Sequence, residues 1–260
     1  MEEKQISKQE EQTKIVNNQL GFVLLEDANL DWPRFRKALT DEWHLDVSND
    51  EVKDGSVVYR INDMLVACSL MPNPVPDNEA ENNARNSVMW KNASEEVAKH
   101  KAHCMIAIIS KNGTPIEQAE LFAKVAASML RLKNTIGIYK YPTVYQNEFY
   151  INIAEAMKHG EFPTPIAIHV GMYLSEGKMN AYTTGMQFFG KDEIEVTNSL
   201  AQPGELYGFM LSIAEYVILE DATLTPGETI GFTEEQKLPI SKSAGVAMPV
   251  ETIKIGFMPG

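Results

Sequence analysis

Two kinds of hydrophobic periodicity divide this chain into strands and helices. A short apolar run at residues 20–25 predicts the first buried strand. Asp31 then precedes a segment with apolar residues at helical spacing, and Pro33 stands in its first turn, so we expect a capped helix. The apolar stripe of this helix predicts packing against a core and consists of Trp32, Phe35, Leu39 and Trp43.

A β-hairpin and a crossover follow the first helix. Two apolar runs flank Asn62-Asp63, which is a two-residue turn signal. Three prolines end the second run. A polar helix, broken near Trp90, is then expected over residues 79–101, and the apolar residues at 103–109 predict a buried strand. This β-α-β-β-α-β order is typical of the ferredoxin-like split unit.

The clearest local signal in the chain is a capping box. Thr114 and Glu117 stand three residues apart before an apolar segment, which predicts the start of a helix. A strand is expected over residues 136–141. Asn147 is then expected to cap a further helix that ends at Gly160 in a left-handed conformation.

The remaining elements complete an α+β pattern. Alternation over residues 166–174, a turn and a second run over residues 180–188 predict an antiparallel hairpin. Pro203 opens an amphipathic helix, and short strands close the chain. We therefore expect an α+β fold of ferredoxin-like split units, with a largely antiparallel sheet and helices packed on it. The expected division is a polar tail at residues 1–18, an N-terminal half at residues 19–145, and a C-terminal half at residues 146–260 that packs closely against it.

The charge of the chain limits the partners that its surface can bind. Its 260 residues include 23 basic and 36 acidic side chains, which give a net charge of −13. Such a surface repels a phosphate backbone, so nucleic-acid binding is not expected, whereas a basic protein partner would be attracted. No apolar stretch is long enough to span a bilayer and no signal peptide is evident, so we expect no membrane association and a cytoplasmic location.

The residue types that usually perform chemistry are placed unfavourably for it. Cys68 and Cys104 lie in apolar runs, where a thiol is typically buried, so neither is expected to be a nucleophile. His100, His103 and Cys104 supply only three metal ligands, and residues 103 and 104 point to opposite faces of a strand, so no metal site is expected. The sequence has no phosphate-binding glycine loop, nucleophile elbow or zinc-protease motif, and no cofactor is expected.

Two groups of residues remain as candidate sites. His169 is expected to face outward from its strand, where it could act as a base in a shallow pocket with Tyr173 and Tyr182. A hydrogen-bonded structural histidine is the favoured interpretation, because no acid or nucleophile near it in sequence orients it. The second group could attract a basic partner, bind a hard cation or form a solvated surface, and comprises Lys191, Asp192, Glu193, Glu195, Glu234 and Glu235.

Three segments resemble a known family of domains. They are SLMPNPVPD at residues 69–77, GMQFFGKDEIE at residues 185–195 and GETIGFTEEQKLPI at residues 227–240. In this order they are similar to domain-of-unknown-function family 4261, over about residues 20–257. The resemblance implies a bacterial, cytoplasmic α+β protein. Because the family has no assigned activity, the resemblance implies no site residues.

These observations leave three interpretations of function. The net charge, the lack of catalytic motifs and the acidic segments favour a non-enzymatic interaction protein, one version of which neutralises a basic toxin or effector. The alternative is an unrecognised enzyme or a small-ligand sensor with its site near residues 166–188. A third interpretation is a homo-oligomer that assembles through an exposed sheet edge.

Overall fold

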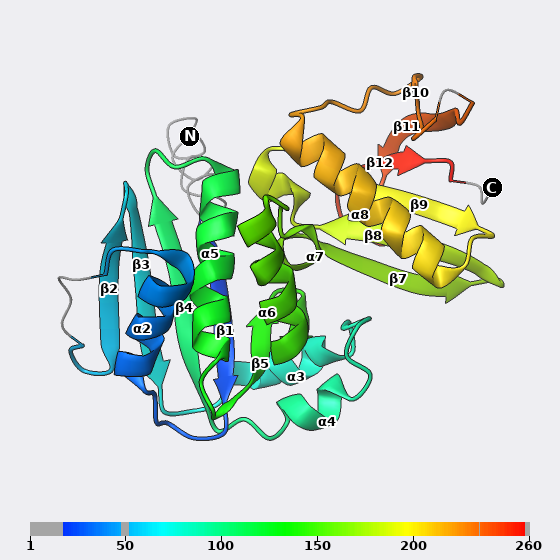
Figure 1. The fold of residues 1–260 in the computed structure, drawn as a ribbon. Coiled ribbons are helices and arrows are strands. Elements are labelled where there is room, and N and C mark those ends of the chain that lie inside the picture. The colour runs from blue at the N-terminus through cyan, green and yellow to red at the C-terminus, as the bar shows by residue number, and fades with distance from the viewer. Residues whose placement is uncertain (1–17, 48–51, 234, 258–260) are drawn as a thin grey trace, which may run out of the picture. The chain divides into compact units, whose positions relative to one another are not determined.

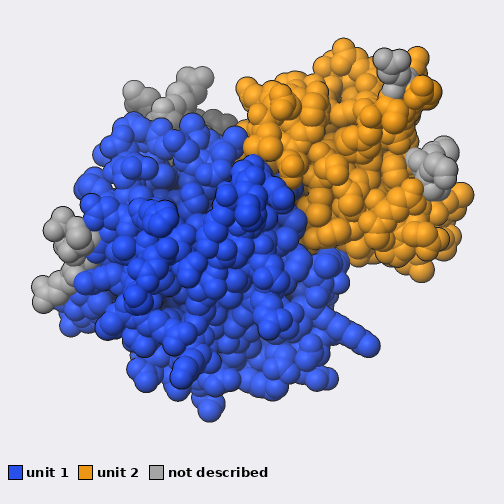
Figure 2. Space-filling view, in the orientation of Figure 1, with its two compact units in different colours: residues 1–166 blue, residues 167–260 orange. Residues whose placement is uncertain are grey.

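The structure is a computed structural model that describes residues 18–47, 52–233 and 235–257. The chain forms two compact units, residues 1–166 and residues 167–260 (Figure 2). The sequence-based division at residue 145 assigned the helix at residues 147–156 to the C-terminal half. In the structure this helix packs on a helix of the first unit and contributes Tyr150 and Ala154 to the core of that unit. Residues 1–17 of the expected polar tail lie outside the described residues.

The first unit is built on a six-stranded antiparallel sheet. Its strand order is β2-β3-β4-β1-β5-β6. The strands are β1 (Gln19–Leu25), β2 (Ser56–Ile61), β3 (Met64–Met71), β4 (Ala102–Ser110), β5 (Thr135–Lys140) and β6 (Thr143–Gln146).

Helices cover both faces of this sheet. Helices α2 (Trp32–Trp43), α5 (Pro115–Leu130) and α6 (Asn147–Ala156) lie side by side over one face, where Val23 and Leu25 of β1 enter the larger core (Figure 1). On the opposite face, α3 (Glu79–Ala84) and α4 (Ala93–Val97) pack with Leu24 and Trp90 against β5 and β6. The alternation along β1 therefore supplies two separate cores.

The predicted α+β class, with antiparallel sheets and helices packed on them, is confirmed. The strand order of the first unit is a correction to the ferredoxin-like prediction. That unit would place β1 beside β3, whereas here β4 lies between them and is antiparallel to both. The orders differ because the connection from β3 to β4, which contains α3 and α4, places β4 directly beside β3. A hydrophobic pattern marks the faces of a strand and leaves its neighbours undetermined.

Local signals predicted the starts of two helices in this unit. The Asp31 carboxylate accepts the N–H of Arg34, and Thr114 and Glu117 form the reciprocal capping box of α5. Asn147 is a correction, because it is the first residue of α6 instead of its cap. Its side-chain amide donates to the carbonyl oxygen of Thr135 at 2.7 Å and so ties α6 to β5.

The second unit contains a mixed six-stranded sheet. Its order is β10-β11-β12-β9-β8-β7, and the only parallel pair among the described strands is β12 with β9. Helix α8 (Pro203–Leu219) packs on β7 and β8 (Figure 1). The strands are β7 (His169–Ser175), β8 (Lys178–Thr184), β9 (Ile194–Ser199), β10 (Thr229–Ile230), β11 (Leu238–Ala244) and β12 (Glu251–Ile255).

The strand predicted at residues 166–174 starts later in the structure than the alternation of its residues predicts. Residues Thr164–Ala167 form the short helix α7, so β7 starts only at His169. Residues Met186–Phe189 likewise form a 3₁₀ turn after β8. Among the residues that the structure describes, no helix has both the length and the apolar character required to cross a membrane.

Candidate functional site

A row of paired residues crosses one face of the sheet in the second unit. Gly171 of β7 pairs with Tyr182 of β8, Tyr182 pairs with Glu195 of β9, and Glu195 pairs with Lys254 of β12. Paired residues point to the same face, so these side chains are neighbours. The last pair exists because β9 and β12, almost 60 residues apart in sequence, run parallel.

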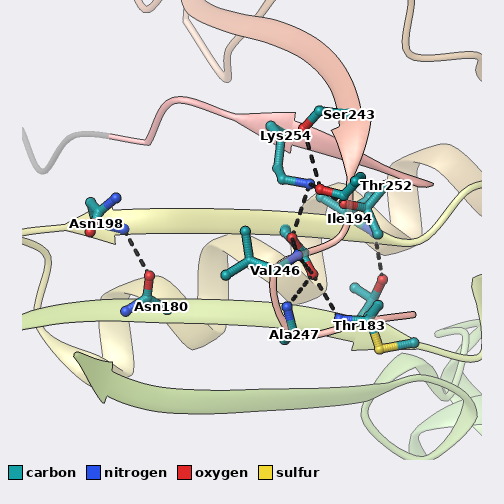
Figure 3. A network of polar contacts seen from close by, with 12 residues as sticks. Asn180, Thr183, Ile194, Asn198, Ser243, Val246, Ala247, Thr252 and Lys254 are labelled. Carbon is teal, nitrogen blue, oxygen red and sulfur yellow. Dashed lines mark hydrogen bonds and ion pairs between the residues drawn. The ribbon is translucent and has the colours of Figure 1, made fainter. Parts of the chain in front are cut away.

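The Glu195 carboxylate is the centre of a buried polar network. It accepts the backbone N–H groups of Val246 at 2.9 Å, Ala247 at 2.9 Å and Met248 at 3.2 Å, and its Oε2 lies 3.0 Å from Nζ of Lys254 (Figure 3). Glu195 is only 1% exposed. The carboxylate thus holds the loop at residues 245–248, which we call the strap, across the strands.

The side chain of Lys254 and a tight glycine turn complete the strap. The ammonium of Lys254 also donates to the carbonyl oxygen of Ala244 and to the hydroxyl of Thr252. A Cβ at Gly245 would lie 2.2 Å from the carbonyl oxygen of Met248, so only glycine allows the turn to close this tightly. Burial raises the pKa of Glu195, but the N–H of Val246, the ammonium of Lys254 and the N–H of Ala247 outweigh it and hold that pKa below its usual value.

The neighbouring acid, Glu193, has a similar structural role. It accepts the hydroxyl of Thr183 at 2.7 Å and the N–H of Gly185 at 2.9 Å, and it is 2% exposed. The hydroxyl oxygen of Thr183 in turn accepts the N–H of Ile194 (Figure 3). Glu193 therefore fixes the turn after β8 and the start of β9.

These contacts correct part of the predicted partner surface. Glu193 and Glu195 are buried and committed to internal hydrogen bonds, so they do not belong to a surface that a partner could contact in this conformation. A charged segment suggested solvation, but the sequence could not show that backbone N–H groups converge on these carboxylates. Glu235 is exposed, and Glu234 lies outside the described residues.

Lys191 and Asp192, from the same segment, line a hollow of about 320 Å³ within the second unit. Lys191 pairs with Asp221 at 2.5 Å and donates to the carbonyl oxygen of Ala222, while Asp192 pairs with Lys242 at 2.8 Å. Apolar side chains from β9, β12, α8 and the following loop complete the lining, namely Ile194, Ile253, Val217 and Leu224.

The predicted pocket residues form an aromatic cluster. The Tyr182 ring lies 6.2 Å from that of His169 and 6.5 Å from that of Tyr173. A Cβ at Gly171 would lie 2.3 Å from the Tyr182 ring, so the ring is packed against the backbone of β7. None of the three residues lines the hollow described above.

The prediction that His169 faces outward is wrong, because the residue is only 6% exposed. No hydrogen-bond partner for its Nε2 lies among the described residues, and burial lowers its pKa to about 4. A neutral imidazole in this setting is a packed ring with one unsatisfied nitrogen.

The remaining titratable candidates are engaged or unreactive. Nε2 of His100 accepts the N–H of Val75 at 2.9 Å, and Nδ1 of His103 lies 2.8 Å from the carbonyl oxygen of Asn73, so both rings hold the proline-rich connector. Burial raises the pKa of Cys104 to about 12, although a backbone hydrogen bond at Ser69 opposes the effect. Within the described ranges, no group of three or more His, Cys, Asp and Glu side chains is arranged to hold a metal ion.

Comparison with known proteins identifies one segment of the chain. Residues 182–256 match the model of a family described as Domain of unknown function (DUF4261), which confirms the resemblance over this part of the second unit. The matched residues include Tyr182, Glu195 and Lys254 of the row. No curated protein and no solved structure matches the chain.

Sequence reasoning missed several residues that shape this unit. Lys254 and Thr183 are polar residues in strands, and no local pattern connects them to the acids. Gly245 and Pro249 do mark a turn, which is the one signal that could have located the strap. The pairing of Asp221, at the end of α8, with Lys191, just before β9, could be recognised only once α8 and β9 were placed together.

Proposed function

We propose that the protein is a non-enzymatic, acidic interaction module that binds a basic protein partner through its second unit. The observation that carries the proposal is the distribution of charge. Residues 167–260 contain twelve acidic side chains, five lysines and no arginine, a balance of −7, whereas the longer first unit contributes only −6. A field of one sign on a small unit raises the rate at which an oppositely charged partner associates.

The chemistry of the site also favours binding over catalysis. Glu193 and Glu195, the two buried acids of the described residues, already accept backbone N–H groups. His169 is buried, and burial raises the pKa of both thiols. In the same proposal, the protein acts in the cytoplasm of a bacterium, and neutralisation of a basic effector or toxin is one form that its action would take.

The test is affinity capture with the full chain, from a lysate of the organism that encodes it, at low and high salt. Captured protein is then purified and its association rate measured against two charge variants. One carries Glu228→Gln, Glu235→Gln and Glu251→Gln, which are exposed positions of the second unit. The matched control carries the same three-charge change at exposed positions of the first unit, as Glu26→Gln, Glu95→Gln and Glu148→Gln.

We expect a basic partner whose binding weakens with salt and whose association rate falls several-fold more in the second-unit variant than in the control. Equal effects of the two variants would contradict a partner site on the second unit. Failure to retain any basic protein at low salt would contradict the proposal as a whole.

A second candidate function, a small-ligand sensor or an unrecognised enzyme near residues 166–188, is favoured by one observation. Nε2 of His169 is buried with no described partner, and a ligand atom could satisfy it. A thermal-shift screen of small polar ligands on the wild type and on His169→Gln tests this. Stabilisation seen only in the wild type would support a sensor, and the same response in both would exclude His169 from the site.

A further inference from the structure

The hollow in the second unit lies at the carboxyl end of α8. Val217 and the loop at residues 222–224 form one side, and Ile194 of β9 and Ile253 of β12 form the apolar floor. A hollow of about 320 Å³ is at the lower end of the range for small-ligand sites. It is therefore large enough for a single side chain and too small for a folded segment.

The electrostatic field at this place favours a cation. The carboxyl end of a helix carries partial negative charge, and the last turn of this 17-residue helix contains no basic residue. Glu220 and Asp221 follow directly, and Asp192 stands at the rim. One acid of the lining, and two acids that directly precede the lining residue Ala222 in the chain, thus accompany the apolar floor.

Two lysines near the hollow carry the opposite charge and partly neutralise these acids. Lys191 is 13% exposed and is held by Asp221 and by the carbonyl oxygen of Ala222, so its charge is used to fix the wall. Lys242 pairs with Asp192. Asp192 and Asp221 nevertheless keep 47% and 94% of their side chains exposed, which leaves surface on both carboxylates for a second cation.

We propose that this hollow receives one lysine or arginine side chain of the partner, with its methylene stem on the apolar floor and its charged end between Asp192 and Asp221. A long cationic side chain is the chemistry that matches both parts, since its stem covers apolar surface while its head stays at the rim. The inference rests on the proposed function, because it names the side chain by which a basic partner would be anchored.

The test uses the full chain and three defined probes. The probes are capped pentapeptides of alanine with lysine, arginine or norleucine at the centre, and norleucine keeps the apolar stem while removing the charge. Binding is followed by the NMR shifts of the backbone amides of Lys191, Ala222 and Leu224. The variants are Asp192→Asn with Asp221→Asn, and the matched control is Asp63→Asn in an exposed turn of the first unit.

We expect the lysine and arginine probes to shift these amides and the norleucine probe to leave them unchanged. The Asp192→Asn/Asp221→Asn double variant should bind the cationic probes roughly fivefold more weakly, because exposed charge pairs contribute modest energies. Asp63→Asn should bind as the wild type does. Thermal unfolding of the double variant checks that it is folded.

The outcomes separate this inference from the proposed function. Equal shifts with norleucine would overturn the cationic occupant. If the captured partner binds the double variant as well as it binds the wild type, with its salt dependence intact, the hollow is excluded while the proposed function stands. If neither the probes nor any basic protein binds at low salt, both fail.

Discussion

The buried imidazole of His169 couples stability to pH. Its folded-state pKa of about 4 lies below the ordinary value near 6.5, so between these values the unfolded chain binds more protons than the folded one. The neutral ring is therefore compatible with folding above pH 6.5, and stability is lost as the pH falls toward 4. We expect this single group to lower the free energy of unfolding by about 2 kcal/mol when the pH falls from 7 to 5.

Urea unfolding followed by circular dichroism at pH 7 and pH 5 measures this loss. His169→Gln removes the titrating group, so the difference between the two pH values should shrink by about the same amount. His159→Gln is the matched control, because His159 is exposed and its substitution should leave the difference unchanged. A pH dependence that is the same in all three proteins would contradict a neutral buried imidazole.

The Glu195 carboxylate should be among the most sensitive residues of the second unit. Glu195→Gln removes the one carboxylate that pairs with the ammonium of Lys254 in the described residues and turns part of an acceptor into a donor that faces the strap N–H groups. Breaking a buried pair in this way costs about 3 kcal/mol or more. We expect the amides of Val246 and Ala247 to lose protection from hydrogen exchange.

The control for this substitution is Glu251→Gln, the same change at an exposed position on β12. It should alter stability by less than about 0.5 kcal/mol and leave the strap amides protected. If Glu195→Gln kept full protection at Val246 and Ala247, the carboxylate would not be what holds the strap.

At the scale of single elements, the start of α5 depends on its capping box. The hydroxyl oxygen of Thr114 accepts the N–H of Glu117, and the Glu117 carboxylate accepts the N–H of Thr114 at 2.8 Å. The backbone N–H and then the hydroxyl of Thr114 hold the pKa of Glu117 below its usual value. Thr114→Ala removes one half of the box and should destabilise the first unit by about 1 kcal/mol.

Tryptophan fluorescence during urea unfolding measures this change, because all three tryptophans lie in the first unit. Thr40→Ala makes the same change at an exposed position inside α2, where the hydroxyl only donates to the carbonyl oxygen of Arg36. That control should unfold like the wild type or slightly later, since alanine favours a helix. Equal destabilisation by both substitutions would show that the box contributes nothing specific.

At the scale of the whole molecule, the reactivity of the two thiols shows whether the first of the two units is folded. Cys68 and Cys104 are both buried in its larger core, where burial raises the pKa of each thiol. Only a thiolate reacts, so the native chain should react with a disulfide reagent at pH 8 orders of magnitude more slowly than glutathione does. In denaturant both thiols should react at once.

The dependence of this reaction on urea should follow the unfolding curve from tryptophan fluorescence, because both signals come from the first unit. A thiol that reacts within seconds in the native chain would contradict the buried sheet in which the structure places it.

The elements themselves could be predicted from local sequence because local forces form them. Asp31, Thr114 and the Asn62-Asp63 turn act on residues within four positions of themselves, so the sequence was enough to locate two helix starts and a hairpin. The α+β class follows from the same short-range patterns, and so does the interruption near Trp90 that separates α3 from α4.

The neighbours of each element were decided by tertiary structure. Whether β4 lies beside β3 or beyond β1, and whether β12 joins β9, depends on backbone hydrogen bonds between residues far apart in sequence. Every strand has the same backbone donors and acceptors, so its sequence pattern does not select its neighbour. The same pairing brings Lys254 to Glu195 and closes the strap over it. The sequence by itself determined that residues 192–195 are acidic. Only the fold buried Glu193 and Glu195 among backbone N–H groups and left Asp192 at the rim of a hollow, because burial depends on chain segments that lie far away in sequence.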